Sequence, residues 1–578
     1  MQQNLRLFLW LGLALAIWLN VEAWLKDYGT PATAGAPTAT APAPAPGLAS
    51  SVPDAVPASR LAEQPAPAAV AATGAVPAAP LAHPPTPAAV APAAAPPVPR
   101  IRVSTDVYEV EISTRGGDLL GASLLHYPLR KDQPNVKVRL FNDRAGTGMY
   151  LLQTGLTGGS RAPEPNHLAL FTAPGTQFRL GDGQQELRVP LSWTNGQGLS
   201  VTKTFVFRRG SYAVDVVYDI QNAGTAPVAL ASYGQLLRHW EHAERSMWDV
   251  ESYAFKGPAI YDGTKYRKLD VEDDDDKALS QGITNGWAAS LQHHFVAAIV
   301  PAKDQAYQFQ LKVDGRDYLL RTVGPTQTVA PSGTLRLREK LYFGPKLQDQ
   351  LAATGPRLEL TADYGKLTIL AQPLFWLLDH VHRVIGNWGW TIVIVTLLIK
   401  LVFYKLSETS GRSMAKMRAV APRIKAMQER YKDDREGQAR AMMELYKREK
   451  INPLAGCLPI VVQIPFFLAF YWVLLESVEM RQAPFMLWIQ DLSSRDPFFV
   501  LPLLMGAAMY GQYKLNPTPP DPMQAKVFAF MPVVMTGMFA FFPAGLVLYW
   551  LTNTLLSIAQ QWHINRVVEA ETKKERSN

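Results

Sequence analysis

One charged side chain interrupts an apolar run in the C-terminal half of the chain. The stretch WTIVIVTLLIKLVFY, Trp390 to Tyr404, would be an ordinary membrane-spanning helix without Lys400. A charge inside a span costs about 2.5 to 3.5 kcal/mol on insertion scales and tends to face a wet cavity. Thr396 lies one helical turn before Lys400 and falls on the same face. The spacing therefore predicts a polar stripe with a functional cation.

A purely structural interpretation of Lys400 stays open at this point. Lys405 follows five residues later, so Lys400 lies roughly 7 Å from the expected end of the helix. A long lysine side chain can snorkel over that distance to reach water.

Other residue types that do chemistry give weaker signals. HWEHAE, with His239 and His242, and the pair His293 and His294 match no zinc-ligand spacing, so strand-end histidines are expected there and no metal site. The run EDDDDK lacks the ligand alternation of a calcium loop and predicts a solvated acidic loop. We find no phosphate-binding loop, dinucleotide fingerprint or Gly-x-Ser-x-Gly, which argues against an ATP-driven transporter or serine hydrolase and predicts no cofactor.

Composition divides the chain before Lys400 into segments of different kinds. Residues 1–27 contain one apolar run behind Arg6 and predict a transmembrane signal anchor with a cytoplasmic N-terminus, although Ala32-Thr33-Ala34 also fits a cleavable signal peptide. Residues 28–100 are rich in Ala and Pro and predict a disordered linker. The single cysteine excludes an intramolecular disulfide, so an exported domain depends on its core alone.

Residues 101–356 show the alternation of strands with one buried face, which predicts a large all-β sandwich. The clearest runs are VYEVEIS (107–113), SVTKTFVFRR (200–209), YAVDVVYDI (212–220) and TLRLREKLYFG (334–344). Residues 357–387 have apolar positions at helical spacing and predict an amphipathic helix at the membrane interface.

Residues 388–565 predict a core of five spans, and residues 566–578 a short basic tail. The expected spans are 388–404, 454–475, 497–513, 527–542 and 544–564. Basic residues exceed acidic ones between the first two spans, so that segment is expected in the cytoplasm. The C-terminus is then cytoplasmic, and the sandwich lies on the opposite side of the membrane.

Residues 408–450 predict a cytoplasmic helical hairpin with a Met-rich and basic surface. Its two helices are expected in MAKMRAVAPRIKAMQERYKDD and REGQARAMMELYKREK, with KDD as the turn between them. The hairpin either fixes topology only or docks a client, lipid headgroups or ribosomal RNA. The candidate docking residues are Met414, Met417, Arg418, Arg423, Lys425 and Met442.

Several long runs in the core resemble one known family. They are SMAKMRAVAPRIKAMQERYKDD, KINPLAGCLPIVVQIPFFLAFYWVL, ESVEMRQAPFMLWIQDLSSRDPFFVLPLLMG, NPTPPDPMQAKVFAFMPVV and FFPAGLVLYWLTNTLLSIAQQ, which are similar to the YidC membrane protein insertases of Gram-negative bacteria. The resemblance implies an α-helical inner-membrane protein with an N-terminal anchor, a five-helix insertase core and a periplasmic sandwich. It implies a non-enzymatic insertase that helps membrane proteins fold, alone or with the Sec translocon.

The resemblance also implies a mechanism and a set of site residues. In that family a hydrophilic groove, open to cytoplasm and lipid, carries one basic residue that attracts the acidic part of a client. Lys400 stands where the family usually has arginine, and Trp550 where it usually has tyrosine. The other implied groove residues are Thr396, Gln463, Tyr549, Thr552 and Asn553. Implied partners are nascent membrane proteins, the Sec translocon with its accessory proteins, the ribosome, the signal recognition pathway and anionic lipids, but not DNA.

Two other functions remain as alternatives. A secondary transporter also places charge between spans, but it normally has repeated halves and more spans. A membrane-anchored carbohydrate-binding protein would carry its chemistry in the sandwich, where the sequence shows no convincing acid–base pair.

Overall fold

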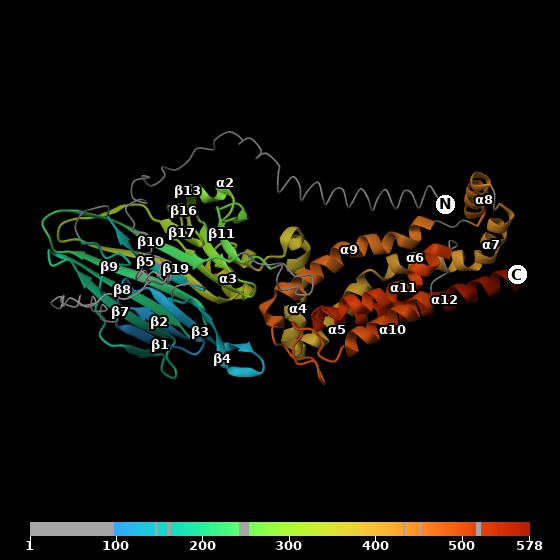
Figure 1. Ribbon diagram of the computed structural model, residues 1–578, viewed down its shortest axis with the longest axis horizontal. Helices are drawn as coiled ribbons and strands as arrows, with labels where there is room; N and C mark the ends of the chain where they lie inside the picture. The colour runs from blue at the N-terminus through green and yellow to red at the C-terminus, as the bar shows by residue number, and fades with distance from the viewer. Residues whose placement is uncertain are drawn as a thin grey trace, which may run out of the picture. The chain divides into compact units, whose positions relative to one another are not determined.

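A computed structural model describes residues 98–144, 148–158, 163–241, 254–431, 434–449, 453–515 and 522–577 (Figure 1). The predicted anchor and nearly all of the predicted linker lie outside these residues. The chain divides into two compact units, and the boundary lies between Thr361 and Ala362. The first unit is rich in strands and the second is helical.

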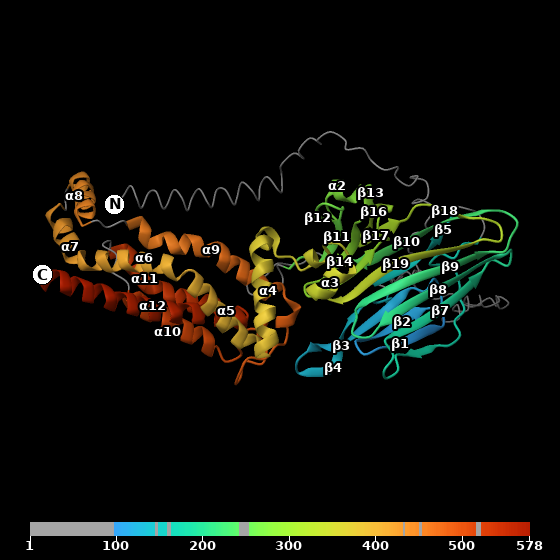
Figure 2. The same ribbon diagram turned by 180° about the vertical axis from the view of Figure 1, so that it is seen from behind.

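Two sheets form the first unit, as both views of the ribbon show (Figure 2). Among the described residues, the larger sheet has eleven strands in the order β13 (Ser280–Thr284), β16 (Ala306–Asp314), β17 (Asp317–Val323), β10 (Val228–His239), β5 (Tyr150–Thr157), β3 (Leu119–Arg130), β2 (Tyr108–Ser113), β1 (Arg100–Ser104) and β6 (Gln177–Arg179), with β18 (Gln327–Val329) beside β10 and β4 (Gln133–Leu140) beside β3. The smaller has eight: β12 (Tyr266–Lys268), β11 (Gly257–Tyr261), β14 (Trp287–Leu291), β15 (Phe295–Val300), β19 (Thr334–Pro345), β9 (Ala213–Asn222), β8 (Leu199–Arg208) and β7 (Glu186–Thr194).

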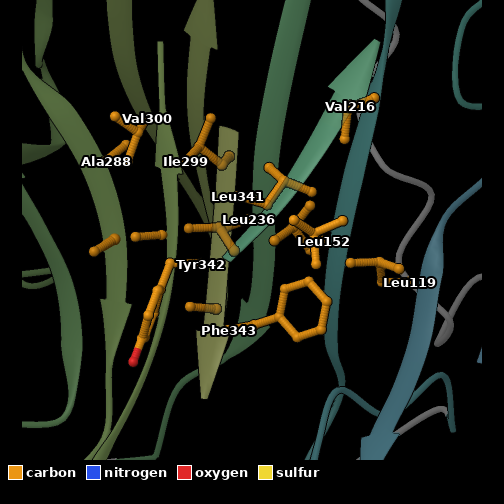
Figure 3. Packing of buried hydrophobic residues seen from close by; sticks show 14 of the residues in the cluster. Leu119, Leu152, Val216, Leu236, Ala288, Ile299, Val300, Leu341, Tyr342 and Phe343 are labelled. Atoms are coloured by element: carbon orange, nitrogen blue, oxygen red, sulfur yellow. The ribbon is translucent and has the colours of Figure 1, made fainter. Parts of the chain in front are cut away.

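The predicted β-sandwich is confirmed, and its four clearest runs are strands β2, β8, β9 and β19. Alternation decides which side chains enter the core. In β9, Val214, Val216 and Tyr218 are buried against their partners in β8 and β19. Leu119 and Leu152 of the other sheet meet Leu341 and Phe343 across the interior (Figure 3).

A lysine lies within this apolar interior. Lys203 is fully buried, and its Nζ donates to the backbone oxygens of Gly116 at 2.7 Å and Thr154 at 2.8 Å. Two buried acids act on its charge: Asp118, which accepts from Gln153 at 2.6 Å, and Glu339. Burial lowers the pKa of Lys203 and raises the pKa of Glu339 to about 7. Burial thus favours the uncharged form of each of these two side chains.

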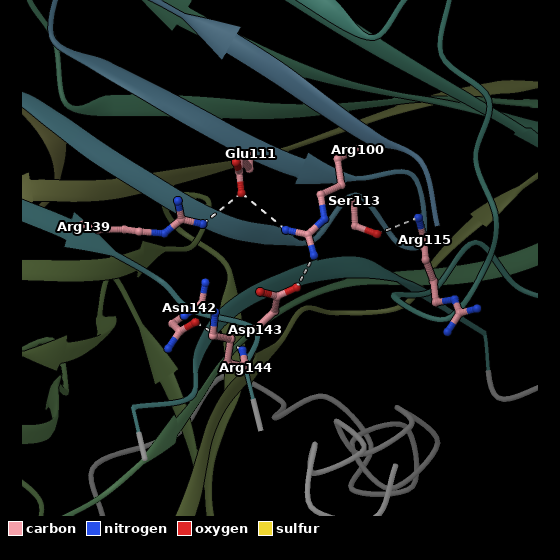
Figure 4. Close-up of polar contacts among 8 residues, drawn as sticks. All are labelled: Arg100, Glu111, Ser113, Arg115, Arg139, Asn142, Asp143 and Arg144. Carbon is pink, nitrogen blue, oxygen red and sulfur yellow. Dashed lines mark hydrogen bonds and ion pairs between the residues drawn. The ribbon is translucent and has the colours of Figure 1, made fainter. Parts of the chain in front are cut away.

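The surface of the larger sheet carries an ion-pair network (Figure 4). Glu111 of β2 accepts from Arg139 of β4 at 2.9 Å and from Arg100 of β1 at 3.4 Å, and Arg100 also pairs with Asp143 at 2.7 Å. These side chains are partly exposed, so each pair contributes little to stability.

The histidines and the acidic run have structural partners. His239 ends β10 and pairs with Asp317 at 2.7 Å, and His293 and His294 stack at 3.8 Å between ring centroids. His242 lies outside the described residues. The acidic run forms one helical turn, α2 (Asp274–Lys277), rather than the predicted loop, because Asp273 caps its first amides. Within the described ranges, no group of three His, Cys, Asp or Glu side chains is placed to hold a metal ion.

The helical unit begins with an amphipathic helix. After α3 (Gln348–Thr354), η4 (Leu358–Thr361) and η5 (Gly365–Leu367), helix α4 runs over Thr368–Ile385. Its buried face contains Leu374, Phe375 and Leu378, while Trp376 and Val384 are exposed. The helix starts later than the predicted segment because the two short 3₁₀ helices η4 and η5 precede it.

Five further helices occupy the predicted spans: α5 (Trp388–Val402), α9 (Pro453–Glu476), α10 (Val500–Leu515), α11 (Pro522–Phe539) and α12 (Ala544–Ser577). A short 3₁₀ helix, η6 (Val478–Met480), follows α9. In the part of the chain that the structure describes, no single helix has both the length and the apolarity to cross a bilayer. Helix α5 and the start of the next helix, α6 (Tyr404–Ala419), reach that threshold together, with a bend of 65° between them.

The hairpin differs from its prediction in one respect. The expected single helix through residues 414–431 is wrong, because α6 (Tyr404–Ala419) ends before Val420 and α7 (Ala421–Arg430) begins after it. Pro422 lies in the first turn of α7, where its missing N–H costs nothing, whereas inside a continuous helix its ring would clash with the preceding turn. Helix α8 (Arg435–Arg448) completes the hairpin.

Candidate functional site

The candidate site centres on a contact between α5 and α12. Lys400 is half-buried in the last turn of α5, and its Nζ donates to the Ser557 hydroxyl at 2.7 Å. Ser557 in turn donates to the backbone oxygen of Asn553, one turn earlier on α12, at 2.7 Å. The ammonium therefore rests on a hydroxyl that the helix backbone holds in place.

No carboxylate neutralises this cation within the described residues. The hydrogen bond to Ser557 is the contact that Lys400 makes, and no Asp or Glu of the described chain lies within ion-pair distance. By contrast, Lys405 at the start of α6 is well exposed and pairs with Glu408 at 3.4 Å. A half-buried charge without a counter-ion is costly, so a site built this way favours an incoming anion.

The threonines of the predicted groove lie on the same two helices. Thr396 is 1% exposed, and its hydroxyl donates to the backbone oxygen of Ile392 at 2.6 Å. Thr552 is also buried, and Asn553 is half-buried. Thr396 and Lys400 are four residues apart on α5, as are Asn553 and Ser557 on α12, so each helix has a polar stripe.

Aromatic side chains join α9 to α12 beside these stripes. Tyr549 stacks on Phe470 at 4.5 Å and on Phe467 at 5.9 Å between ring centroids. Trp550 meets Phe467 edge-on at 4.6 Å and also contacts Phe539 of α11. Tyr549 and Trp550 thus pack within an aromatic cluster, which fixes α12 against α9.

Gln463 is the groove candidate that the structure does not join to the others. It is half-buried on α9, and its amide has no hydrogen-bond partner among the described side chains and backbone. Its role as a groove residue stays a prediction.

The hairpin residues divide into three groups. Met442 is 3% exposed in a small core with Val420 and Ile424, and Met417 packs against that core. Arg423 pairs at 2.7 Å with Glu449, the residue that follows the last turn of α8. The side chains of Met414, Arg418 and Lys425 lie outside the described part of the structure. Docking by this surface stays a prediction.

A loop between α9 and α10 holds the other end of the site. Asn387 caps α5 by accepting from the Trp390 amide at 3.1 Å, and its side-chain amide donates to the Phe485 backbone oxygen at 2.9 Å. Gly389 allows this approach, because a Cβ there would lie 2.0 Å from Phe485 Cδ2. The start of α5 is therefore pinned to the loop.

Two aspartates organise the same loop. Asp496 is 1% exposed and accepts from Trp488 Nε1 at 3.0 Å, the Phe498 amide at 3.0 Å and the Leu501 amide in the first turn of α10 at 2.7 Å. Asp491 is half-buried and accepts from the Gln482 amide and from the serines at 493 and 494.

The start of α12 is bound to this loop as well. The amides of Ala544 and Gly545 donate to the backbone oxygens of Ser494 and Leu492 at 2.7 and 2.8 Å. One loop thus fixes the first turns of α5, α10 and α12.

Ser557, Asn387 and Asp496 are site residues that the sequence analysis missed. The spacing of four between Asn553 and Ser557 would have extended the predicted polar stripe on α12. Asn387, directly before an apolar run, has the residue type of a helix cap. Asp496 carries no comparable signal, because its donors come from three separate positions.

Comparison with known proteins relates each of the two units to a family model. The family model of the YidC periplasmic domain matches residues 100–377, and that of the 60Kd inner membrane protein matches residues 380–573. A membrane protein insertase YidC of Thioalkalivibrio sulfidiphilus is 48% identical over 99% of this chain and 100% of its own length. One from Pseudomonas putida is 46% identical over 97% and 98% of the two chains.

A crystal structure of an active YidC insertase with its first transmembrane domain resolved covers 80% of this chain and 93% of its own, with 19% identity and a TM-score of 0.37. That superposition is too loose to support any statement about geometry. The family models and the relatives suffice without it: this chain belongs to the YidC membrane protein insertase family of the bacterial inner membrane.

Proposed function

We propose that this chain inserts nascent proteins into the inner membrane and helps them fold, alone or with the Sec translocon, and that Lys400 is the residue that attracts the client. The observation that carries the proposal is the half-buried ammonium of Lys400, which has a hydroxyl partner and no counter-ion among the described residues. In this mechanism the lysine faces a hydrophilic groove between polar stripes of α5 and α12.

The first step is electrostatic. An acidic residue in the soluble part of a client approaches Lys400, and two unit charges 4 Å apart attract by about 4 kcal/mol at an effective dielectric constant of 20. The lysine ammonium is a compact charge, whereas the planar guanidinium of arginine pairs with a carboxylate through two parallel hydrogen bonds. The attraction to Lys400 therefore depends little on the orientation of the carboxylate. The hydrogen bond to Ser557 keeps the ammonium in position until the client arrives.

The second step is partition into lipid. Helices α10 and α11 expose large apolar side chains, among them Leu503, Phe530 and Val533. We assign this surface to lipid, with the five helices α5 and α9 to α12 as spans, the hairpin and C-terminus in the cytoplasm and the sandwich in the periplasm. The client's apolar segment then slides along α10 and α11 while its soluble part follows the groove.

The hairpin is the proposed docking element for the ribosome, the signal recognition pathway and anionic lipid. Its basic residues supply charge, and Met443 supplies an exposed apolar side chain. The internal core around Met442 would keep the two helices together during docking.

A charge series in reconstituted vesicles tests the proposal. Lys400→Glu should reduce insertion of a client with an acidic translocated tail at least tenfold, and Lys400→Arg should preserve it. Lys405→Glu is the matched control, because this lysine is exposed at the other side of the bend. Insertion at the wild-type rate by Lys400→Glu would refute the proposed role of the lysine.

A further inference from the structure

The loop that pins α5, α10 and α12 exposes four large apolar side chains. Met486 and Leu487 lie in its first arm, with 43% and 69% of their surface exposed, and Phe498 and Phe499 lie in its second arm, with 66% and 40%. Nothing in a loop that only connects two helices requires so much exposed apolar surface.

One carboxylate oxygen brings the two arms together. Trp488 Nε1 and the Phe498 amide both donate to Oδ1 of Asp496, each at 3.0 Å. The residues next to Trp488 in the first arm therefore lie close to those next to Asp496 in the second. The four side chains are presented from a frame that internal hydrogen bonds make rigid.

Backbone strain falls on two of these four residues. Leu487 has φ 52° and Phe499 has φ 56°, in the left-handed region that bulky residues rarely adopt. Asparagine or glycine would occupy such positions at lower cost. The backbone strain at Leu487 and Phe499 indicates that a function requires these two side chains to be exposed in the directions that the strained backbone gives them.

The apolar surface continues from the loop onto α10. Phe499 directly precedes this helix, and the Leu503 amide donates to the Phe499 backbone oxygen at 3.1 Å, so the two side chains lie one turn apart. Leu503 and Leu504 are 62% and 50% exposed. Phe499 is therefore exposed to the same surroundings as Leu503 and Leu504.

We propose that Met486, Leu487, Phe498 and Phe499 form a rigid anchor that inserts into the acyl boundary of the lipid leaflet at this end of the helices. Gln490 and Arg495 of the same loop are also exposed, and the Gln490 side-chain amide donates to the Leu487 backbone oxygen at 2.7 Å. Anchors of this kind reach roughly 5–10 Å into the interface. The anchor rests on the membrane placement in the proposed function, and it fixes the depth of the loop that holds α5 and α12.

Depth-dependent quenching tests the anchor on the full chain. Cys457 is the single cysteine, so a Cys457→Ser background accepts one probe at a time. Leu487→Cys and Phe498→Cys are labelled with an environment-sensitive fluorophore and reconstituted in phosphatidylethanolamine and phosphatidylglycerol vesicles. Asp182→Cys, in an exposed turn of the sandwich, is the matched control.

Both loop probes should be quenched at least threefold more by lipid spin-labelled at carbon 5 than by aqueous iodide, whereas the control responds to iodide only. Iodide quenching of the loop probes equal to the control would overturn the anchor. Protection from both quenchers would also overturn it, because protein rather than lipid would then cover the patch. Client insertion is measured on the same vesicles, so loss of the proposed function is separable from loss of lipid contact.

Discussion

Replacing Asp496 by alanine tests whether burial, rather than the number of hydrogen bonds, decides what a loop aspartate contributes. Asp496→Ala removes the acceptor of three donors, of which the Leu501 amide is buried. Hydrogen bonds to a charged acceptor contribute about 1.5 to 3 kcal/mol each when water cannot replace them. We expect a loss of about 3 to 5 kcal/mol and a Tm roughly 10 °C lower for the helical unit.

Asp491→Ala is the matched control within the same loop. Its carboxylate accepts four hydrogen bonds, one more than Asp496, but it is half-buried and water can reach its donors. We expect a loss of about 1 kcal/mol. Thermal unfolding of both variants in detergent, followed by dye binding to exposed apolar surface, gives the comparison. A Tm that falls as far for Asp491→Ala as for Asp496→Ala would refute the reasoning.

Two further predictions concern the sandwich core and a helix contact. Burial raises the pKa of Glu339 from 4.5 to about 7, against the opposing attraction of Lys203, so the folded state keeps a proton that the unfolded chain has released. The contribution of Glu339 to the free energy of unfolding of the sandwich should therefore fall between about pH 4.5 and pH 7, by about 3 kcal/mol at most. Glu339→Gln should weaken this pH dependence in denaturant titrations at several pH values, while Asp118, whose pKa burial also raises to about 7, should maintain the remainder. Gly389→Ala should destabilise the helical unit by about 1 to 3 kcal/mol because its methyl overlaps Phe485, while Gly511→Ala, which meets open space, should be neutral or stabilising by thermal unfolding.

The sequence predicted the sandwich because alternation is a local property of each strand. Residues 200–209 and 212–220 show it without any knowledge of their neighbours, and both are strands in one sheet. The same pattern places Lys203 on the inward side of β8, but it gives no information on the two carbonyl oxygens that accept from its ammonium, since these come from distant segments.

The sequence pointed to Lys400, at the centre of the candidate site, but not to Ser557, its hydrogen-bond partner. A charge within an apolar run marks Lys400 by contrast with its own neighbours. Ser557 is an unremarkable helix residue until α12 packs against α5, because 157 positions separate the two side chains. The break at Val420 was readable from Pro422, whose effect on a helix is local, and the continuous helical periodicity on both sides hid it.

The helices α5 and α12 are held together on both sides of Lys400. Asn387 and Gly545 bind the loop at one end, and beyond the bend the Gln560 amide of α12 donates to the Tyr404 backbone oxygen at 3.4 Å. Lys400 lies about 20 Å of helix away from Asn387, directly before that bend. A rotation of α5 by about 10° about the loop contacts would move Lys400 by about 3.5 Å, which is more than the length of the lysine–serine hydrogen bond. The contacts beyond the bend oppose such a rotation, so they preserve the distance between the ammonium and its hydroxyl partner.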